Sequence, residues 1–104
     1  MFCNITTSTD QKEIAKKISR KLLEKKYSPC VQITSPVESQ YLWDGEIKST
    51  QEYKIDIKTL DNLSEKVMII IKSIHNYKVP EIIKKPIAIE NKDYKTWVLE
   101  NTKK

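Results

Sequence analysis

Residues 30–47 read CVQITSPVESQYLWDGEI, and this stretch decides the fold because six of its apolar side chains share one parity: Val31, Ile33, Val37, Tyr41, Trp43 and Ile47. Residues 53–57 continue the alternation, with Tyr53, Ile55 and Ile57 separated by polar neighbours. A period of two is typical of strands that bury one face. We therefore predict two long strands joined by a hairpin turn at the polar group 48–51.

The length of the first strand has a consequence of its own. At roughly 3.3 Å per residue, residues 30–47 would span about 60 Å as one strand, whereas a domain of this size has a radius of gyration of about 13 Å. The strand must therefore break, bend or project beyond the core. A projecting hairpin that carries Tyr41 and Trp43 predicts contact with a partner subunit. The alternative is a loop at Ser35 and Pro36 that splits two ordinary strands.

Two segments beside this hairpin carry apolar residues at helical spacing. The first follows the capping candidates 8–10 and should end near Tyr27, because the next residue precedes a proline and is pushed out of the helical region. The second should begin at Asp61 or Asn62 and reach Ile74. The start of each helix has the spacing of a capping box, as in Asp10 with Glu13 and Asn62 with Glu65.

The remaining segments complete a known order of elements. Residues 1–7 and 79–89 predict a first and a last strand, and residues 94–98 predict a short helix. Two prolines confine the last strand to a sheet edge. Strand, helix, strand, strand, helix, strand and an extra helix give the ferredoxin-like α+β fold, with an antiparallel sheet and both main helices on one face. We predict a single domain over residues 1–104.

Composition narrows the classes of partner and compartment. The net charge is +5, but only Arg20 among 19 basic residues is arginine and the lysines are dispersed, which argues against nucleic acid. The longest apolar run, 67–71, falls far short of the about 20 residues of a membrane span. The N-terminus lacks signal-peptide features, and two cysteines make no disulfide framework. We expect a soluble, cytoplasmic protein with no membrane or nucleic-acid partner.

The sequence also lacks the residue patterns of common catalytic sites. Its one glycine, Gly45, excludes a phosphate loop and a dinucleotide fingerprint. No HExxH motif or paired-cysteine zinc site is present. Nothing near Cys3 or Cys30 suggests an activated thiol that could pair with His75. We therefore expect a protein that is not an enzyme.

Five segments, taken together in their order and spacing, resemble the CutA divalent-cation-tolerance family. They are SPCVQI (28–33), SQYLWDGEI (39–47), EYKIDIKT (52–59), HNYKVPEII (75–83) and YKTW (94–97). The resemblance implies a ferredoxin-like homotrimer, similar in shape to PII signalling proteins, whose long hairpin reaches neighbouring subunits. It also implies an association with tolerance to copper and other divalent cations. The alternative function is a PII-like trimer that signals or binds a small ligand in the intersubunit cleft.

Three positions depart from the family pattern. Asn76 stands where the family usually has proline, and Ser35 and Pro36 replace a Pro-Gly pair. Thr6 lies near the position at which some members offer a cysteine, whereas Cys3 has the opposite strand parity. A copper site that needs a thiol at this position of the first strand is therefore not expected.

The candidate metal ligands are His75, Glu81 and Cys30, with copper or another divalent cation as the ligand. One histidine per chain is too few, but a trimer can supply three copies, or Glu81 and a cysteine can complete the set. The alternative for His75 is structural, with an imidazole that interacts with the dipole and the last carbonyls of a helix end.

A second group of candidates belongs to an intersubunit cleft or interface: Tyr41, Trp43, Lys58, Tyr77 and Trp97. Tyr77, Lys58 and Trp43 come from different elements. Their convergence with Glu81 would make either a pocket for a small anion or metal, or a polar network that fixes the trimer. Trp97 is also expected to pack beside Tyr94.

Overall fold

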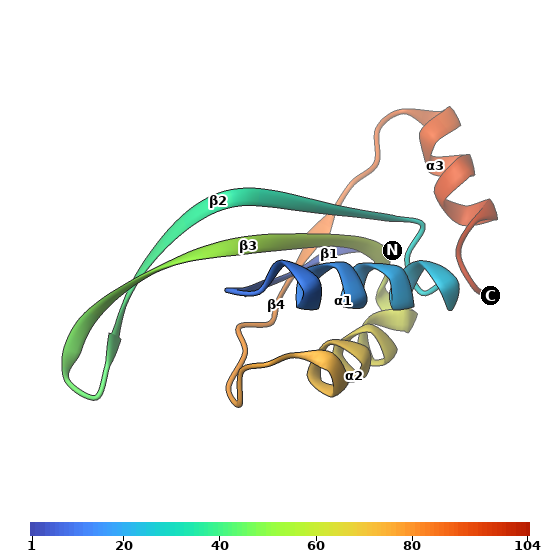
Figure 1. Cartoon of the computed structure of the whole chain (residues 1–104). Coiled ribbons are helices and arrows are strands. Elements are labelled where there is room, and N and C mark those ends of the chain that lie inside the picture. The colour runs from blue at the N-terminus through green and yellow to red at the C-terminus, as the bar shows by residue number, and fades with distance from the viewer.

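The computed structural model describes residues 1–104 and contains one sheet of four strands. The sheet order is β2-β3-β1-β4, and every neighbouring pair is antiparallel. Figure 1 shows α1 and α2 on one face of this sheet, with α3 set apart near the start of β2. The elements are β1 (Phe2–Thr9), α1 (Lys12–Glu24), β2 (Cys30–Trp43), β3 (Glu46–Leu60), a 3-10 turn (Asp61–Leu63), α2 (Ser64–Ile74), β4 (Ile83–Ile87) and α3 (Lys92–Glu100). This architecture confirms the predicted ferredoxin-like α+β fold.

The core lies between the sheet and the two main helices. Ile5 of β1 pairs with Ile57 of β3, and both are fully buried. Alternation places their side chains on the face that α1 and α2 cover. The helical stripes meet them with the buried residues Ala15, Ile18, Leu22, Val67 and Ile71.

The hairpin of β2 and β3, which we call the arm, projects beyond this core. The molecule measures 46 × 25 × 21 Å, and Figure 1 shows the arm curving away from the body to a free tip. The predicted projection is therefore confirmed. Ser35 and Pro36 do not split β2 into two strands; they lie at a bulge between Thr34 and Val37 within one strand.

The turn of the arm differs from the prediction. It lies at Asp44 and Gly45, with φ angles of 51° and 76°, and not at residues 48–51. Two successive positive φ angles are typical of the tight hairpin turn favoured by Asp-Gly. The polar group 48–51 instead pairs with residues 38–41 inside the ladder. The polarity of the group misled the prediction, because both faces of a projecting strand can be exposed.

Several boundaries also differ. The first strand extends to Thr9, and the last is only Ile83–Ile87, at the predicted edge. Helix α1 ends at Glu24 rather than near Tyr27. Neither α1 nor α2 has a side-chain cap hydrogen bond, so the predicted capping boxes do not form. No helix is both long enough and apolar enough to span a membrane.

Candidate functional site

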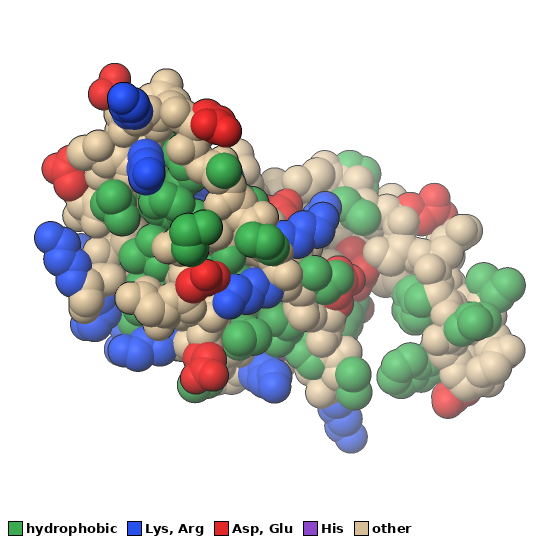
Figure 2. Space-filling model, turned by 180° about the vertical axis from the view of Figure 1, so that it is seen from behind, with side chains coloured by type: hydrophobic (Ala, Val, Ile, Leu, Met, Phe, Trp, Pro, Cys, Tyr) green, Lys and Arg blue, Asp and Glu red, His purple; other side chains and the backbone are tan.

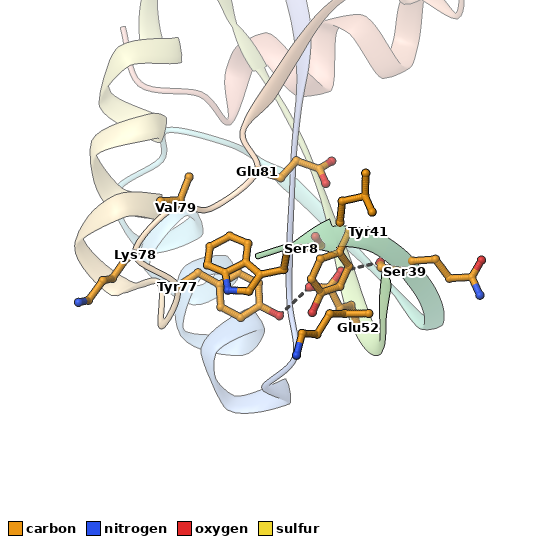
Figure 3. A pocket seen from close by; sticks show the side chains of 12 residues that line it. Ser8, Ser39, Tyr41, Glu52, Tyr77, Lys78, Val79 and Glu81 are labelled. Atoms are coloured by element: carbon orange, nitrogen blue, oxygen red, sulfur yellow. Dashed lines mark hydrogen bonds between the residues drawn. The ribbon is translucent and has the colours of Figure 1, made fainter. Parts of the chain in front are cut away.

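A cavity of about 760 Å³ lies between the arm and the loop that follows α2. We call it the arm cavity. Ser39, Tyr41, Trp43 and Glu52 line it from the arm, and the loop contributes Tyr77, Lys78, Val79 and Glu81. Figure 3 shows these side chains converging from two segments that are distant in the sequence.

Glu52 is the most buried charged side chain of this cavity, with 7% of its surface exposed. The Ser39 hydroxyl donates a hydrogen bond to one carboxylate oxygen (2.6 Å), and the Tyr77 hydroxyl donates to the other (2.6 Å). Figure 3 shows the two donors reaching Glu52 from opposite sides. Because both oxygens accept, the geometry fits an ionised carboxylate.

Tyr77 is held firmly as the neutral phenol. Burial raises its pKa, and the hydrogen bond to Glu52 and the negative charge of that carboxylate raise it further. The phenol therefore remains a hydrogen-bond donor throughout the physiological range. It ties the loop after α2 to the base of the arm.

Other residues that line the cavity are less constrained. Tyr41 and Trp43 are 41% and 55% exposed, and the Tyr41 hydroxyl lies 2.8 Å from that of Thr50. Glu81 is exposed and makes no hydrogen bond or ion pair within the chain. The Lys78 side chain points away from the cavity in Figure 3.

His75 lies beside the cavity and ends α2. Its backbone N–H donates to Ile71. The ring Nε2 lies 2.9 Å from the Ser8 carbonyl oxygen, and the Tyr77 backbone N–H donates to Nδ1 (3.0 Å). A carbonyl can only accept, so Nε2 carries the proton and the ring is neutral. Both nitrogens are thus occupied within the chain.

The electrostatics of His75 follow from this position. Burial lowers its pKa, although the bond to Ser8 and the charges of Glu52 and Asp10 oppose the shift. The ring nitrogens contact Ser8 of β1 and the Tyr77 backbone, and not the last carbonyls of α2 that the structural alternative described. The imidazole fixes the end of α2 against β1 and orients the backbone of Tyr77.

Asn76 adds a second connection at the same corner. Its side-chain oxygen accepts from the Thr9 hydroxyl (2.6 Å), and its amide donates to Asp10 (2.8 Å). The residue that departs from the family pattern thus connects the loop after α2 to the end of β1 and to Asp10, which lies between β1 and α1.

The other predicted residues lie outside the arm cavity. Cys30 begins β2 opposite Lys58, and the Lys58 ammonium donates to Gln32 (2.8 Å). Trp97 stacks on Tyr94 in α3, as expected for packing, with ring centroids 5.6 Å apart. The chain contains no group of three or more His, Cys, Asp or Glu side chains that could hold a metal ion, so His75, Glu81 and Cys30 do not form such a group.

A polar cluster occupies the sheet face opposite the helices. Asn4 and Thr6 both donate to one oxygen of Asp56, at 3.0 and 2.8 Å. Burial alone would raise the pKa of Asp56, but these two hydrogen bonds and the charges of Lys54 and Lys58 outweigh it and lower the pKa. The carboxylate stabilises the pairing of β1 and β3.

Sequence reasoning brought Tyr41, Trp43, Tyr77 and Glu81 to one place but missed Glu52 and Ser39. Glu52 shares its strand parity with Lys54 and Asp56, which predicts an exposed polar face. It is buried because Tyr77 covers it. The sequence signal that could have identified Glu52 is its position as an acidic residue on a strand beside the predicted aromatic cleft.

The fold and the arm together define an α+β protein of ferredoxin-like topology with an extended hairpin. The family model described as "CutA1 divalent ion tolerance protein" matches residues 3–101. The divalent-cation tolerance protein CutA of Thermus thermophilus is 35% identical over 98 residues, covering 94% of this chain and 95% of that protein. The chain therefore belongs to the CutA divalent ion tolerance family, as its motifs predicted.

Solved structures agree with this assignment. The Thermus thermophilus protein superposes with a TM-score of 0.93 at 34% identity, covering 99% of this chain and all of that one (100%). A protein of Archaeoglobus fulgidus, described as a periplasmic divalent cation tolerance protein, gives 0.92 at 32% identity, covering 97% and 98%. The likeness extends over the arm as well as the body.

Proposed function

We propose that this chain acts in divalent-cation tolerance as a homotrimer that binds copper or another divalent cation without catalysing a reaction. The descriptions of its relatives refer to cation tolerance and to no reaction. They give no support to the alternative of a separate PII-like signalling role.

The exposed apolar tip of the arm carries the trimer proposal. Leu42 and Ile47 are 73% and 80% exposed, and Trp43 is 55% exposed. Figure 2 shows hydrophobic side chains gathered on the projecting tip, far from the core of their own chain. Large apolar side chains placed together in this way are typical of protein interfaces. A neighbouring copy is the partner that would bury them.

The metal proposal follows from what one chain lacks. No single chain gathers three ligating side chains, so we propose a cation that is shared between copies. The Glu81 carboxylate has no partner within its own chain and is therefore available as a metal ligand, whereas both His75 nitrogens are already hydrogen-bonded. Carboxylate oxygens suit hard and borderline divalent cations.

Calorimetric titration of Cu(II) into the untagged protein tests this function. We expect saturable binding that weakens about ten-fold or more in Glu81→Gln and stays unchanged in His75→Ala, because loss of a charged ligand weakens a site directly. Cys30→Ser is the control for adventitious binding to a thiol. Absence of saturable binding, or full affinity in Glu81→Gln, would contradict the proposal.

We also propose a cytoplasmic location. Cys3 and Cys30 are both free thiols, as is usual in a reducing compartment. Fractionation of the source cells tests this, and recovery outside the cytoplasm would contradict it.

A further inference from the structure

We propose that the outer face of α1 is a docking surface for an acidic segment of a partner protein. The surface consists of the exposed lysine and arginine side chains of residues 12–26, which are α1 and the two lysines that follow it. We call it the basic face. The inference goes beyond divalent-cation tolerance, because the ligand is a protein and none of these residues is a candidate metal ligand.

The net charge of the chain is concentrated on this one segment. Residues 12–26 carry seven basic and two acidic side chains, a net charge of +5. The whole chain has 19 basic and 14 acidic side chains, so the remaining residues carry twelve of each and are neutral together. A solvated surface usually mixes the two signs. A field of a single sign attracts a partner of the opposite charge.

The cations of the basic face have no ionic partner in their own chain. All seven are exposed. The two ion pairs of the chain, Lys48 with Glu46 and Lys84 with Asp61, lie outside α1. Lys12 is the first residue of α1, the helix end at which a positive charge is unfavourable. The stability of the helix therefore does not account for the distribution of its charges.

The spacing of the cations fits an extended acidic chain. They form two rows with charges four residues apart: Lys12, Lys16 and Arg20, and Lys17, Lys21 and Lys25. Like charges at this spacing repel one another on a helix. Members of a row lie about 6 Å apart along the axis, and side chains on one face of an extended chain recur about every 6.6 Å. A run of Asp or Glu can therefore follow a row and remove the repulsion.

The side chains of the basic face favour carboxylates over other polyanions. Six of the seven cations are lysine, whereas recognition of phosphate groups relies on the planar guanidinium of arginine. Helix α1 has no aromatic side chain that could stack on a base. A helix that lies on a bilayer inserts apolar side chains, and Leu23 is the only large apolar side chain of α1 that is exposed. An acidic protein segment needs only charge and spacing.

The basic face is separate from the apolar tip of the arm. In Figure 1 α1 lies on the body, away from the tip. A neighbouring copy that buries Leu42, Trp43 and Ile47 is not expected to place them on the basic face, because apolar side chains would strip water from ammonium groups without pairing them. The basic face therefore stays open in the proposed trimer, and binding can be measured on the assembled protein.

Fluorescence anisotropy with a labelled peptide of eight glutamates tests the proposal at about 0.15 M salt. A peptide of eight glutamines is the neutral control, and we expect saturable binding of the glutamate peptide only. The dissociation constant should rise about five-fold in Lys17→Gln with Lys21→Gln, because two exposed charge pairs are lost. The matched control, Lys72→Gln with Lys92→Gln, removes the same charge from exposed sites outside α1 and should leave the affinity unchanged.

Three results would overturn the proposal. The first is an absence of saturable binding. The second is equal weakening in the two double variants, which would reduce the attraction to net charge alone. The third is tighter binding of phosphatidylserine vesicles or duplex DNA under the same conditions with the same dependence on Lys17 and Lys21, which would assign the basic face to another class of partner.

Acylation footprinting by mass spectrometry shows whether assembly covers the basic face, while light scattering gives the mass of the same sample. In the free protein Lys17 and Lys21 should react with N-hydroxysuccinimidyl acetate as fast as Lys72 and Lys92, and the glutamate peptide should protect only the first pair. Slow acylation of Lys17 and Lys21 without peptide would place the basic face inside the assembly and overturn the proposal. Cu(II) titration reports on the proposed function independently.

Discussion

The Tyr77 hydroxyl donates a hydrogen bond of 2.6 Å to the carboxylate of Glu52, a residue 25 positions earlier in the chain. Through this bond the loop after α2 holds the base of the arm, while His75 and Asn76 hold the same loop against β1 and against Asp10, which follows β1. The direction of the arm therefore depends on a few polar contacts at one corner.

Replacing Tyr77 with phenylalanine should destabilise the fold. The change removes one of two donors to a buried carboxylate, and a hydrogen bond to a charged group is worth about 1.5–3 kcal/mol. We expect the free energy of unfolding, measured by urea denaturation at fixed protein concentration, to fall by about 2 kcal/mol. The control is Tyr41→Phe, which loses an exposed hydroxyl contact and should change stability by less than about 0.5 kcal/mol. Equal losses in the two variants would refute the role given to Glu52.

Two threonines on the core side of β1 should respond oppositely to valine. The Thr7 hydroxyl is buried and has no hydrogen-bond partner, whereas that of Thr9 donates to Asn76 and accepts from Gln11. Thr7→Val should therefore be neutral or stabilise by up to about 1 kcal/mol, and Thr9→Val should destabilise by about 1 kcal/mol. Thermal and urea unfolding of both variants measure this. A marked loss in Thr7→Val would mean that its hydroxyl has a partner in solution.

The stability of the protein should fall as the pH drops below about 6.5. Burial lowers the pKa of His75 in the folded state from its ordinary value of 6.5. The unfolded chain therefore binds the proton more readily, and stability present above pH 6.5 is lost as the pH falls toward the folded pKa. Unfolding between pH 7.5 and 5 measures the slope above the range of most carboxyl groups.

His75→Asn is the control for this slope. His75 is the only histidine, so the variant should be less stable at pH 7.5 and should lose most of the pH dependence in this range. The same slope in both proteins would assign the titration to another group.

Substitution of Asn76 tests what the protein gains or loses by having asparagine where the family usually has proline. His75 already has the extended conformation that precedes a proline (φ −58°, ψ 142°), and the Asn76 N–H donates to no partner. Asn76→Pro and Asn76→Ala both lose the bonds to Thr9 and Asp10. Proline should be the more stable of the two by about 0.4–1 kcal/mol, because it restricts the unfolded chain. A proline variant less stable than the alanine variant would show that residue 76 cannot adopt the required φ.

The sequence predicted the fold well because its periodicities are strong. The alternation around Ile55 and Ile57 and the stripe through Ile18 and Leu22 each indicate one buried face. The Asp44–Gly45 turn was missed because the polar run after it looked more like a loop, although Asp-Gly is the stronger signal.

The site was harder to predict than the fold. The convergence of Trp43, Tyr77 and Glu81 was expected from motifs, but Lys58 lies elsewhere on the sheet. The burial of Glu52 depends on Tyr77, a contact across distant segments that strand parity cannot reveal. Periodicity identifies the face of one element, not what another element places upon it.

The mass of the protein in solution tests the central claim, that the arm is an element of assembly, most directly. Size-exclusion chromatography with light scattering should give about three times the chain mass of 12.2 kDa. A variant with lysine at both apolar tip positions, Leu42→Lys with Ile47→Lys, should shift toward 12.2 kDa and keep its secondary structure. A wild-type mass of 12.2 kDa at every concentration would contradict the account.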